Sequence, residues 1–473
     1  MATALHLDPD RLFPPDPTTR ALARALYAGV ADLPIVSPHG HTDPAWFADN
    51  ERFANPAELL LVPDHYLYRM LFSQGIALER LGIRPLDGDP TNVERDPRAS
   101  WRLLAENYHL FRGTPSRMWL DHVFAEVFGI AVRLEPETAD LYYDRIEEAL
   151  ASPAFRPRAL FERFNIEVIA TTESPTDPLP YHRKLGESGW SGRVITTFRP
   201  DPVLDPEFEG FTDNLRRLSE LTGEDALSWH GYLAALRNRR AYFASLGATA
   251  TDHGHPTART LDLPEAELAG LFAKAVAGQA DAEQAERFRA GMLTVMAGMS
   301  VEDGLVMQLH PGSRRNHNPR LFARWGRDKG ADIPTRTDYV DALQPLLARY
   351  GEAPGFTFIV FTLDETSYAR ELAPLAGHYP AMKLGPAWWF HDSPEGMRRF
   401  REQTTETAGF YNTVGFNDDT RAFLSIPARH DVARRVDCAF LARLVAEHRL
   451  EEEEAHELAA DLAYRLAKEA YRL

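Results

Sequence analysis

Short apolar runs, each ended by a polar or turn-forming cluster, recur along the 473-residue chain. Runs of this length that are rich in β-branched and aromatic residues are typical of buried strands. Segments with helix-spaced apolar residues fill most of the gaps between them. The pattern predicts eight strands, at residues 33–37, 166–172, 193–198, 247–251, 304–309, 356–362, 381–384 and 410–416.

Eight strands that alternate with helices predict an α/β fold, a parallel (β/α)8 TIM barrel. We expect one barrel domain over residues 1–473, with a large helical insertion at 42–160 after strand 1 and additional helical segments at 203–300. Residues 451–473 predict a C-terminal amphipathic helix whose leucine stripe packs on the body. A doubly wound open sheet is the alternative, but it normally carries a glycine-rich phosphate loop after its first strand.

Composition narrows the classes of partner. The formal net charge is -17 and no long basic run occurs, which argues against nucleic acid and against an anionic membrane. No stretch approaches the roughly 18 apolar residues of a membrane span, and residues 1–15 lack an apolar signal core. The single cysteine, Cys438, fits a cytoplasmic location. Barrels of this size commonly self-associate, so a homo-oligomer stays open.

Polar and aromatic residues follow most of the predicted strands. In a barrel the chemistry gathers at the C-terminal strand ends, so these residues are candidates for one site, although any single one of them could be structural. The candidates, in strand order, are His39 and His41, Arg199, Asp252 and His253, His310, Trp388 and Trp389, and Asp419 and Arg421.

The pair His39 and His41 follows the first strand with one glycine between the two histidines, so both imidazoles can share one metal ion. Taken alone, the pair could equally be a solvated loop, and Asp419 could be a helix N-cap. A His-x-His after strand one with an Asp after strand eight resembles the amidohydrolase superfamily, which implies that His39, His41 and Asp419 hold one divalent metal ion, Zn²⁺. No lysine lies between Lys184 and Lys274, so the lysine that bridges two metals in many such hydrolases is missing and a mononuclear site is expected.

Five segments carry a closer resemblance, to the uronate isomerase (glucuronate isomerase) family. They are DHYLYR at 64–69, FRPD at 198–201, QLHPGSRRN at 308–316, AWWF at 387–390 and DTRAFLS at 419–425. The resemblance covers nearly the whole chain and implies interconversion of D-glucuronate with D-fructuronate and of D-galacturonate with D-tagaturonate. The family pattern differs at Ser37, Pro38, His317 and Thr420, none of them a predicted ligand.

Aldose–ketose isomerisation needs a base and an acid near a polarised carbonyl, and a uronate carboxylate suits arginine. The predicted catalytic residues are His65, Tyr66, Asp419 and Arg421, with Arg421 as the cation beside Tyr66 and Asp419 also accepting a proton during ring opening. The predicted contacts of the small-molecule hexuronate are Arg199, His310, Arg315, Trp388 and Trp389, with His310 on a sugar hydroxyl or in the metal's shell.

Structural explanations compete for several of these residues. The arginines could form ordinary ion pairs, and Tyr66 and the tryptophans could be core packing. The alternative function is a mononuclear metal-dependent hydrolase or decarboxylase on the same barrel, and a third class is a non-catalytic protein that binds sugar acids.

Overall fold

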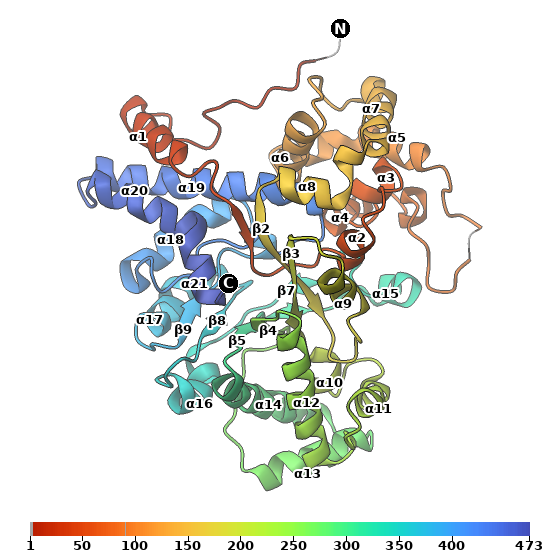
Figure 1. The fold of residues 1–473 in the computed structure, drawn as a ribbon, viewed down its shortest axis with the longest axis vertical. Coiled ribbons are helices and arrows are strands. Elements are labelled where there is room, and N and C mark those ends of the chain that lie inside the picture. Colours follow the sequence, from red (N-terminus) through yellow and green to blue (C-terminus); the bar gives the residue numbers. More distant parts are fainter. Residues whose placement is uncertain (1–2, 90) are drawn as a thin grey trace.

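A curled sheet of seven parallel strands forms the centre of the computed structural model, which describes residues 3–89 and 91–473 (Figure 1). The strands lie side by side in the order β1-β2-β3-β4-β5-β8-β9, so their order in the sheet is also their order along the chain. Their bounds are β1 Ile35–Ser37, β2 Ile166–Glu173, β3 Arg193–Phe198, β4 Ala250–His253, β5 Val306–Leu309, β8 Phe358–Val360 and β9 Met382–Leu384. A separate antiparallel pair consists of β6 Ser313–Arg314 and β7 Ile333–Pro334.

The predicted eighth strand, 410–416, is wrong as a regular strand. An isolated parallel bridge joins Thr413 to Leu384 of β9. Gly415 has φ 72°, and a Cβ there would lie 2.7 Å from the Leu462 carbonyl oxygen, so the chain bends tightly against the C-terminal helix and stops pairing. The following loop instead reaches the segment just after β1, where the His41 N–H donates to the Thr420 carbonyl at 3.0 Å. The barrel fold is confirmed, with an irregular segment in the eighth position.

The fourth strand begins three residues later than predicted. Gly247 has φ 94° and the strand starts at Ala250, so Asp252 and His253 belong to the strand itself. Successive residues of a strand face opposite sides. Ala250 packs inside the barrel and His253 contacts Thr251 on the other face, which places Asp252 on the interior side.

Within the described residues, seven α-helices lie between β1 and β2 and gather on one side of the sheet (Figure 1). Several begin with a capping side chain followed by proline, as at Asp43-Pro44, Asn55-Pro56 and Asp96-Pro97, which satisfies an unpaired N–H and sets the first turn. They are α2 Pro44–Asp49, α3 Pro56–Leu60, α4 His65–Ser73, α5 Pro97–Asn107, α6 Pro115–His122, α7 Ala139–Ala151 and α8 Pro157–Arg163.

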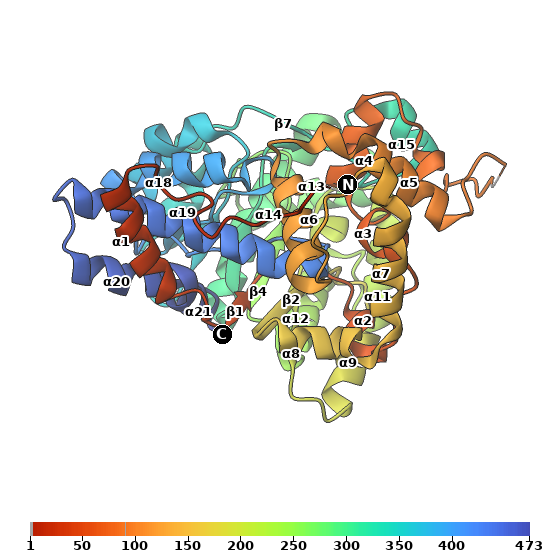
Figure 2. The same ribbon diagram turned by 90° about the horizontal axis from the view of Figure 1, so that it is seen from above.

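The remaining helices surround the sheet, as the second view shows (Figure 2). Before β1 lies α1 Pro17–Ala28. Those after β2 are α9 Pro180–Glu187, α10 Asp201–Leu204, α11 Phe211–Thr222, α12 Trp229–Ser245, α13 Glu265–Val276, α14 Ala282–Asp303, α15 Pro319–Trp325, α16 Val340–Tyr350, α17 Ala373–Ala376, α18 Pro394–Ala408 and α19 Ile426–Ala446. None of the helices in the described residues is both long and apolar enough to cross a bilayer.

The predicted C-terminal helix is present as α20 Glu452–Ala460 and α21 Leu466–Tyr471, joined by a π-helical turn. Its leucine stripe packs with α1 and α19 in one apolar cluster, as expected. The end of α21 enters the barrel, where Tyr471 packs with Ala250, Val306, Ile359 and Val414. Tyr471 donates a hydrogen bond to Gln308 Oε1 at 2.9 Å and accepts one from Asn417 Nδ2 at 3.1 Å. The chain therefore fills its own barrel interior.

Candidate active site

One cavity of about 1060 Å³ lies at the C-terminal ends of the strands. Side chains that are far apart in the sequence meet there, because parallel strands in sequential order bring all their carboxyl ends to one rim. The predicted metal ligands, catalytic residues and substrate contacts all line this cavity: His39, His41, His65, Tyr66, Arg199, His310, Arg315, Trp388, Trp389, Asp419 and Arg421.

His39, His41 and Asp419 come together as the sequence predicts. Asp419 Oδ1 lies 3.5 Å from His39 Nε2 and 3.2 Å from His41 Nε2. Its other oxygen accepts a hydrogen bond from Trp388 Nε1. Asp419 Oδ1 is buried and has no hydrogen-bond donor within the described residues. A buried carboxylate oxygen without a donor, facing two imidazole nitrogens, fits a divalent metal ion.

Burial and the neighbouring charges shift the pKa values of His39 and Asp419 toward the protonation states that bind a metal ion. Burial lowers the pKa of His39 to about 4, so its imidazole is neutral at pH 7, which is the form that binds metals. Burial also works against ionisation of Asp419, but His39 and His41 hold the pKa of that carboxyl below its ordinary value. Two imidazoles and one carboxylate are a donor set typical of Zn²⁺.

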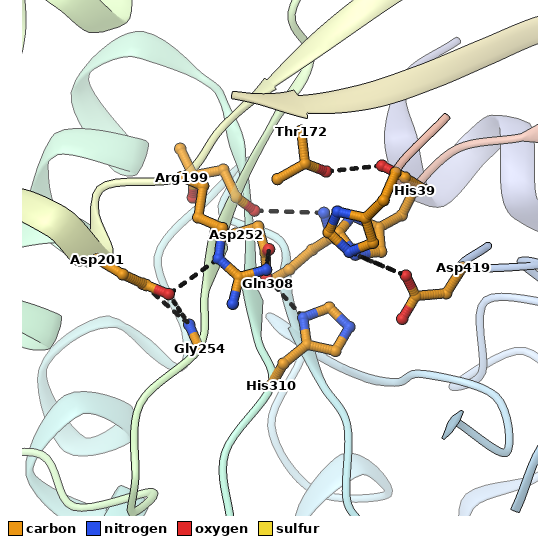
Figure 3. Close-up of polar contacts among 12 residues, drawn as sticks. His39, Thr172, Arg199, Asp201, Asp252, Gly254, Gln308, His310 and Asp419 are labelled. Atoms are coloured by element: carbon orange, nitrogen blue, oxygen red, sulfur yellow. Dashed lines mark hydrogen bonds and ion pairs between the residues drawn. The ribbon is translucent and has the colours of Figure 1, made fainter. Parts of the chain in front are cut away.

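A second acidic group faces the trio. The His310 Nδ1 atom lies 2.6 Å from Asp252 Oδ1, and the His310 ring stacks on that of His39 with centroids 4.8 Å apart (Figure 3). Arg199 Nη1 lies 3.0 Å from the other Asp252 oxygen. His39, Asp252 and His310 form a further group whose ligand atoms lie within 4.8 Å of one another. His310 is thus fixed through Asp252, with its buried Nε2 unpaired in the described structure.

His65 and Tyr66 open helix α4, which Asp64 caps by accepting from the Tyr66 N–H at 2.8 Å. Their rings stack with centroids 4.5 Å apart. Burial, and next the Arg421 guanidinium, lower the pKa of His65 to about 3, so this imidazole is neutral at pH 7. Burial raises the pKa of the Tyr66 phenol above its ordinary value.

A second cation that the sequence did not suggest lies beside Tyr66, while the pairing of Arg421 with Tyr66 stays a prediction. The guanidinium carbon of Arg429, from α19, lies 5.6 Å from the centre of the Tyr66 ring and 3.6 Å from that of Trp119. Arg429 is fully buried and donates to Ser425 and Asp392. Arg421 lies in the loop after the eighth position, and its charge lowers the pKa of His65.

Each predicted arginine has a carboxylate partner. Arg199 Nε donates to Asp201 at 2.9 Å in addition to its contact with Asp252. Arg315 Nη1 donates to Asp332 at 2.9 Å, and Arg421 Nη2 lies 3.1 Å from Asp328. A guanidinium has five N–H donors, so one ion pair leaves several for a substrate.

The two tryptophans differ in what they contact. Trp388 is 5 % exposed, and its ring packs on His310 with centroids 4.6 Å apart while its N–H bonds Asp419. Trp389 is less buried and lies under the Arg315 guanidinium, 5.1 Å from ring centre to carbon. Trp388 therefore orients the centre, and Trp389 is the tryptophan more open to a ligand.

The sequence marks Asp252 as a candidate for the site without giving it a role, and it does not mark Asp328, Asp332 or Arg429. Asp252 could be found from the sequence because it directly follows the predicted fourth strand. The two acids on the connection between β5 and β8 and the arginine on α19 follow no predicted strand, and no local pattern marks them.

The sequential parallel barrel and the His–His–Asp group at its rim define a barrel of the amidohydrolase type with a centre suited to a divalent metal ion. A family model described as glucuronate isomerase matches residues 18–471. The chain belongs to the glucuronate isomerase family, and it is an isomerase.

Individual relatives agree over the full length. The chain is 71 % identical over 477 residues to the uronate isomerase of Sphingopyxis alaskensis and 69 % identical over 472 residues to that of Rhizorhabdus wittichii, with 100 % of each chain covered in both comparisons. The crystal structure of glucuronate isomerase from Caulobacter crescentus matches with a TM-score of 0.97 at 62 % identity, covering 99 % of this chain and 97 % of that one. The uronate isomerase of Thermotoga maritima matches with a TM-score of 0.91 at 26 % identity, covering 98 % and 99 %. The isomerase prediction is confirmed.

Proposed function

We propose that this chain interconverts D-glucuronate with D-fructuronate, and D-galacturonate with D-tagaturonate. The observation that carries the proposal is the cavity in which three metal-ligand candidates, proton-transfer candidates and arginines meet. A hexuronate offers one carboxylate, several hydroxyls and one reacting carbonyl, and this cavity offers a matching group for each.

Arg199 and Arg315 bind the substrate carboxylate. Both guanidinium groups line the cavity, and their ion pairs with Asp201, Asp252 and Asp332 fix their directions in advance. A guanidinium that is already oriented loses less side-chain entropy when it grips a carboxylate. His310 and Trp389 then contact the sugar, His310 through its free Nε2 and Trp389 through its ring face.

His39, His41 and Asp419 hold one divalent ion, which we assign as Zn²⁺ from the donor set. When bound, such an ion supplies a Lewis acid that polarises a sugar oxygen. Trp388 keeps the Asp419 carboxylate in place through its N–H. The second role expected for Asp419, taking a proton in ring opening, stays a prediction.

The reaction moves one proton from C2 to C1 and one from the C2 hydroxyl to the C1 oxygen, through an enediol. His65 and Tyr66 are the groups that we assign to these transfers. His65 is neutral at pH 7, so one of its nitrogens accepts a proton and the other donates one. Arg421 stabilises negative charge on the enediol oxygens as it develops.

Incubation with D-glucuronate in deuterated water tests the proposal. We expect a ketose to form, with deuterium at C1 if the transferred proton exchanges with solvent. The absence of turnover with both D-glucuronate and D-galacturonate would contradict the function. Near-normal turnover in both Tyr66→Phe and Arg421→Met would contradict the residue assignment alone. The cytoplasmic location and a homo-oligomer remain predictions.

A further inference from the structure

The connection between β5 and β8 covers one side of the cavity. It holds the β6–β7 pair and α15, and it contributes several lining residues, among them Arg315, Asp328 and Asp332. Asp332 is 5 % exposed, and its carboxylate accepts hydrogen bonds from Arg315 and from the Asn316 N–H. Asp328 is different, because its side chain is 46 % exposed and faces the open cavity.

The backbone of Asp328 is held in place by helix α4. The Tyr68 hydroxyl donates to the Asp328 carbonyl, and Tyr68 is 2 % exposed. Asp328 has φ 60°, in the left-handed region that only a few residue types adopt readily. A Cβ at Gly330 would lie 2.7 Å from the Arg69 Cβ atom, so the loop touches α4 closely there. The helix that carries His65 and Tyr66 thus fixes the position of Asp328.

Arg421 is the cation that Asp328 meets. Its Nη2 atom lies 3.1 Å from Asp328 Oδ2, and this is the one ion pair that Arg421 makes with the described residues. Arg199 and Arg315 have carboxylate partners of their own. The Arg421 side chain is 41 % exposed, so without Asp328 nothing of opposite charge in the described residues would restrain its long side chain.

We infer that Asp328 is a positioning residue that holds Arg421 over the reacting carbons and keeps the substrate carboxylate away from it. The inference rests on the proposed function, since it assigns Asp328 a part in the same isomerisation. A carboxylate beside Arg421 repels a second carboxylate by like charge. The uronate carboxylate is thereby directed to Arg199 and Arg315, and the aldehyde end of the sugar to Arg421.

Asp328→Asn is the test, because asparagine has the same shape and also tolerates a positive φ, so only the charge is removed. We expect kcat to fall about 10- to 100-fold, the value of one charge-assisted contact. KM should rise by less than about threefold, since the carboxylate contacts remain. Asp338→Asn is the matched control, because Asp338 lies on the same connection and pairs with Arg336 at 3.5 Å but is 66 % exposed and outside the cavity lining. It should keep wild-type turnover.

A double-mutant cycle with Arg421→Met, which removes the cation, separates positioning from a general structural effect. If Asp328 acts through Arg421, Asp328→Asn should change kcat by less than about threefold in the Arg421→Met background. A full loss in that background would overturn the inference, as would wild-type kcat in Asp328→Asn or an equal loss in Asp338→Asn. If the wild-type chain converts no hexuronate, the proposed function fails and this inference with it. If the wild type is active and the cycle is additive, only the inference fails.

Discussion

Removal of one hydroxyl from the barrel interior, in Tyr471→Phe, should destabilise the whole molecule. Tyr471 is fully buried, and its hydroxyl donates to Gln308 and accepts from Asn417. Phenylalanine fills the same space but leaves a carboxamide oxygen and a carboxamide N–H without this partner. The Gln308 N–H bond to the Thr251 carbonyl at 3.3 Å is unaffected.

The expected cost follows from those two lost contacts. A buried polar group left unsatisfied costs about 1–3 kcal/mol, and the loss of a buried hydroxyl that needed desolvation offsets part of the total. We therefore expect the free energy of unfolding to fall by about 2 kcal/mol. At roughly 2.1 cal/mol/K per residue, an unfolding entropy near 1 kcal/mol/K for a chain of 473 residues converts this to a Tm about 2 °C lower.

Urea unfolding followed by circular dichroism measures the change, with differential scanning calorimetry for Tm. The control is Tyr411→Phe, because the Tyr411 hydroxyl bonds Asp461 at 2.9 Å while the residue is 54 % exposed. Its loss should stay below about 0.5 kcal/mol, since water replaces the bond. A Tyr471→Phe loss as small as the control would refute the reasoning that these two carboxamides depend on the hydroxyl.

Three other predictions concern the rim. His39→Ala and Asp419→Ala should each lose the bound ion by elemental analysis, and stoichiometric metal in both would rule out the assigned ligands. Arg315→Met and Arg199→Met should each raise KM for hexuronates about tenfold. Arg199→Met should also lower the unfolding midpoint, because buried Asp252 loses its cation. An unchanged KM in both variants would exclude the two arginines as ligands of the substrate carboxylate. Burial raises the pKa of Glu173 to about 7 from 4.5. Its stabilising effect, about 3 kcal/mol, is therefore complete below pH 4.5 and is lost as the pH rises through about 7. Glu173→Gln should flatten this decline in the free energy of unfolding. An equally steep decline in the variant would show that another group is responsible.

Strand ends can be predicted because the signal is local. An apolar run followed by a polar cluster marks where a buried strand leaves the barrel, so the sequence alone places His39, His310 and Asp419 at one rim. The same rule predicts a regular eighth strand and is wrong there, because the close approach of Gly415 to the C-terminal helix cannot be seen in the segment itself.

Charge partners could not be predicted from the sequence, because they are set by tertiary packing. Arg421 meets Asp328 only through the placement of the β5–β8 connection against α4. Tyr66 meets Arg429 only because α19 packs against the insertion, where it contacts α6. Asp252 is an intermediate case. Its position after the fourth run was visible, but the three-residue shift of β4 decides that it, and not His253, faces the metal-ligand candidates.

The three metal-ligand candidates come from nearly opposite ends of the chain, at positions 39, 41 and 419. At a synthesis rate of ~5–20 residues per second, the histidine pair leaves the ribosome roughly 20–80 s before the carboxylate that completes the centre. An ion captured by the nascent chain in that interval would be held by two imidazoles alone. Metal loading should therefore follow release of the finished polypeptide, and the supply of the ion at that moment decides which one the enzyme carries.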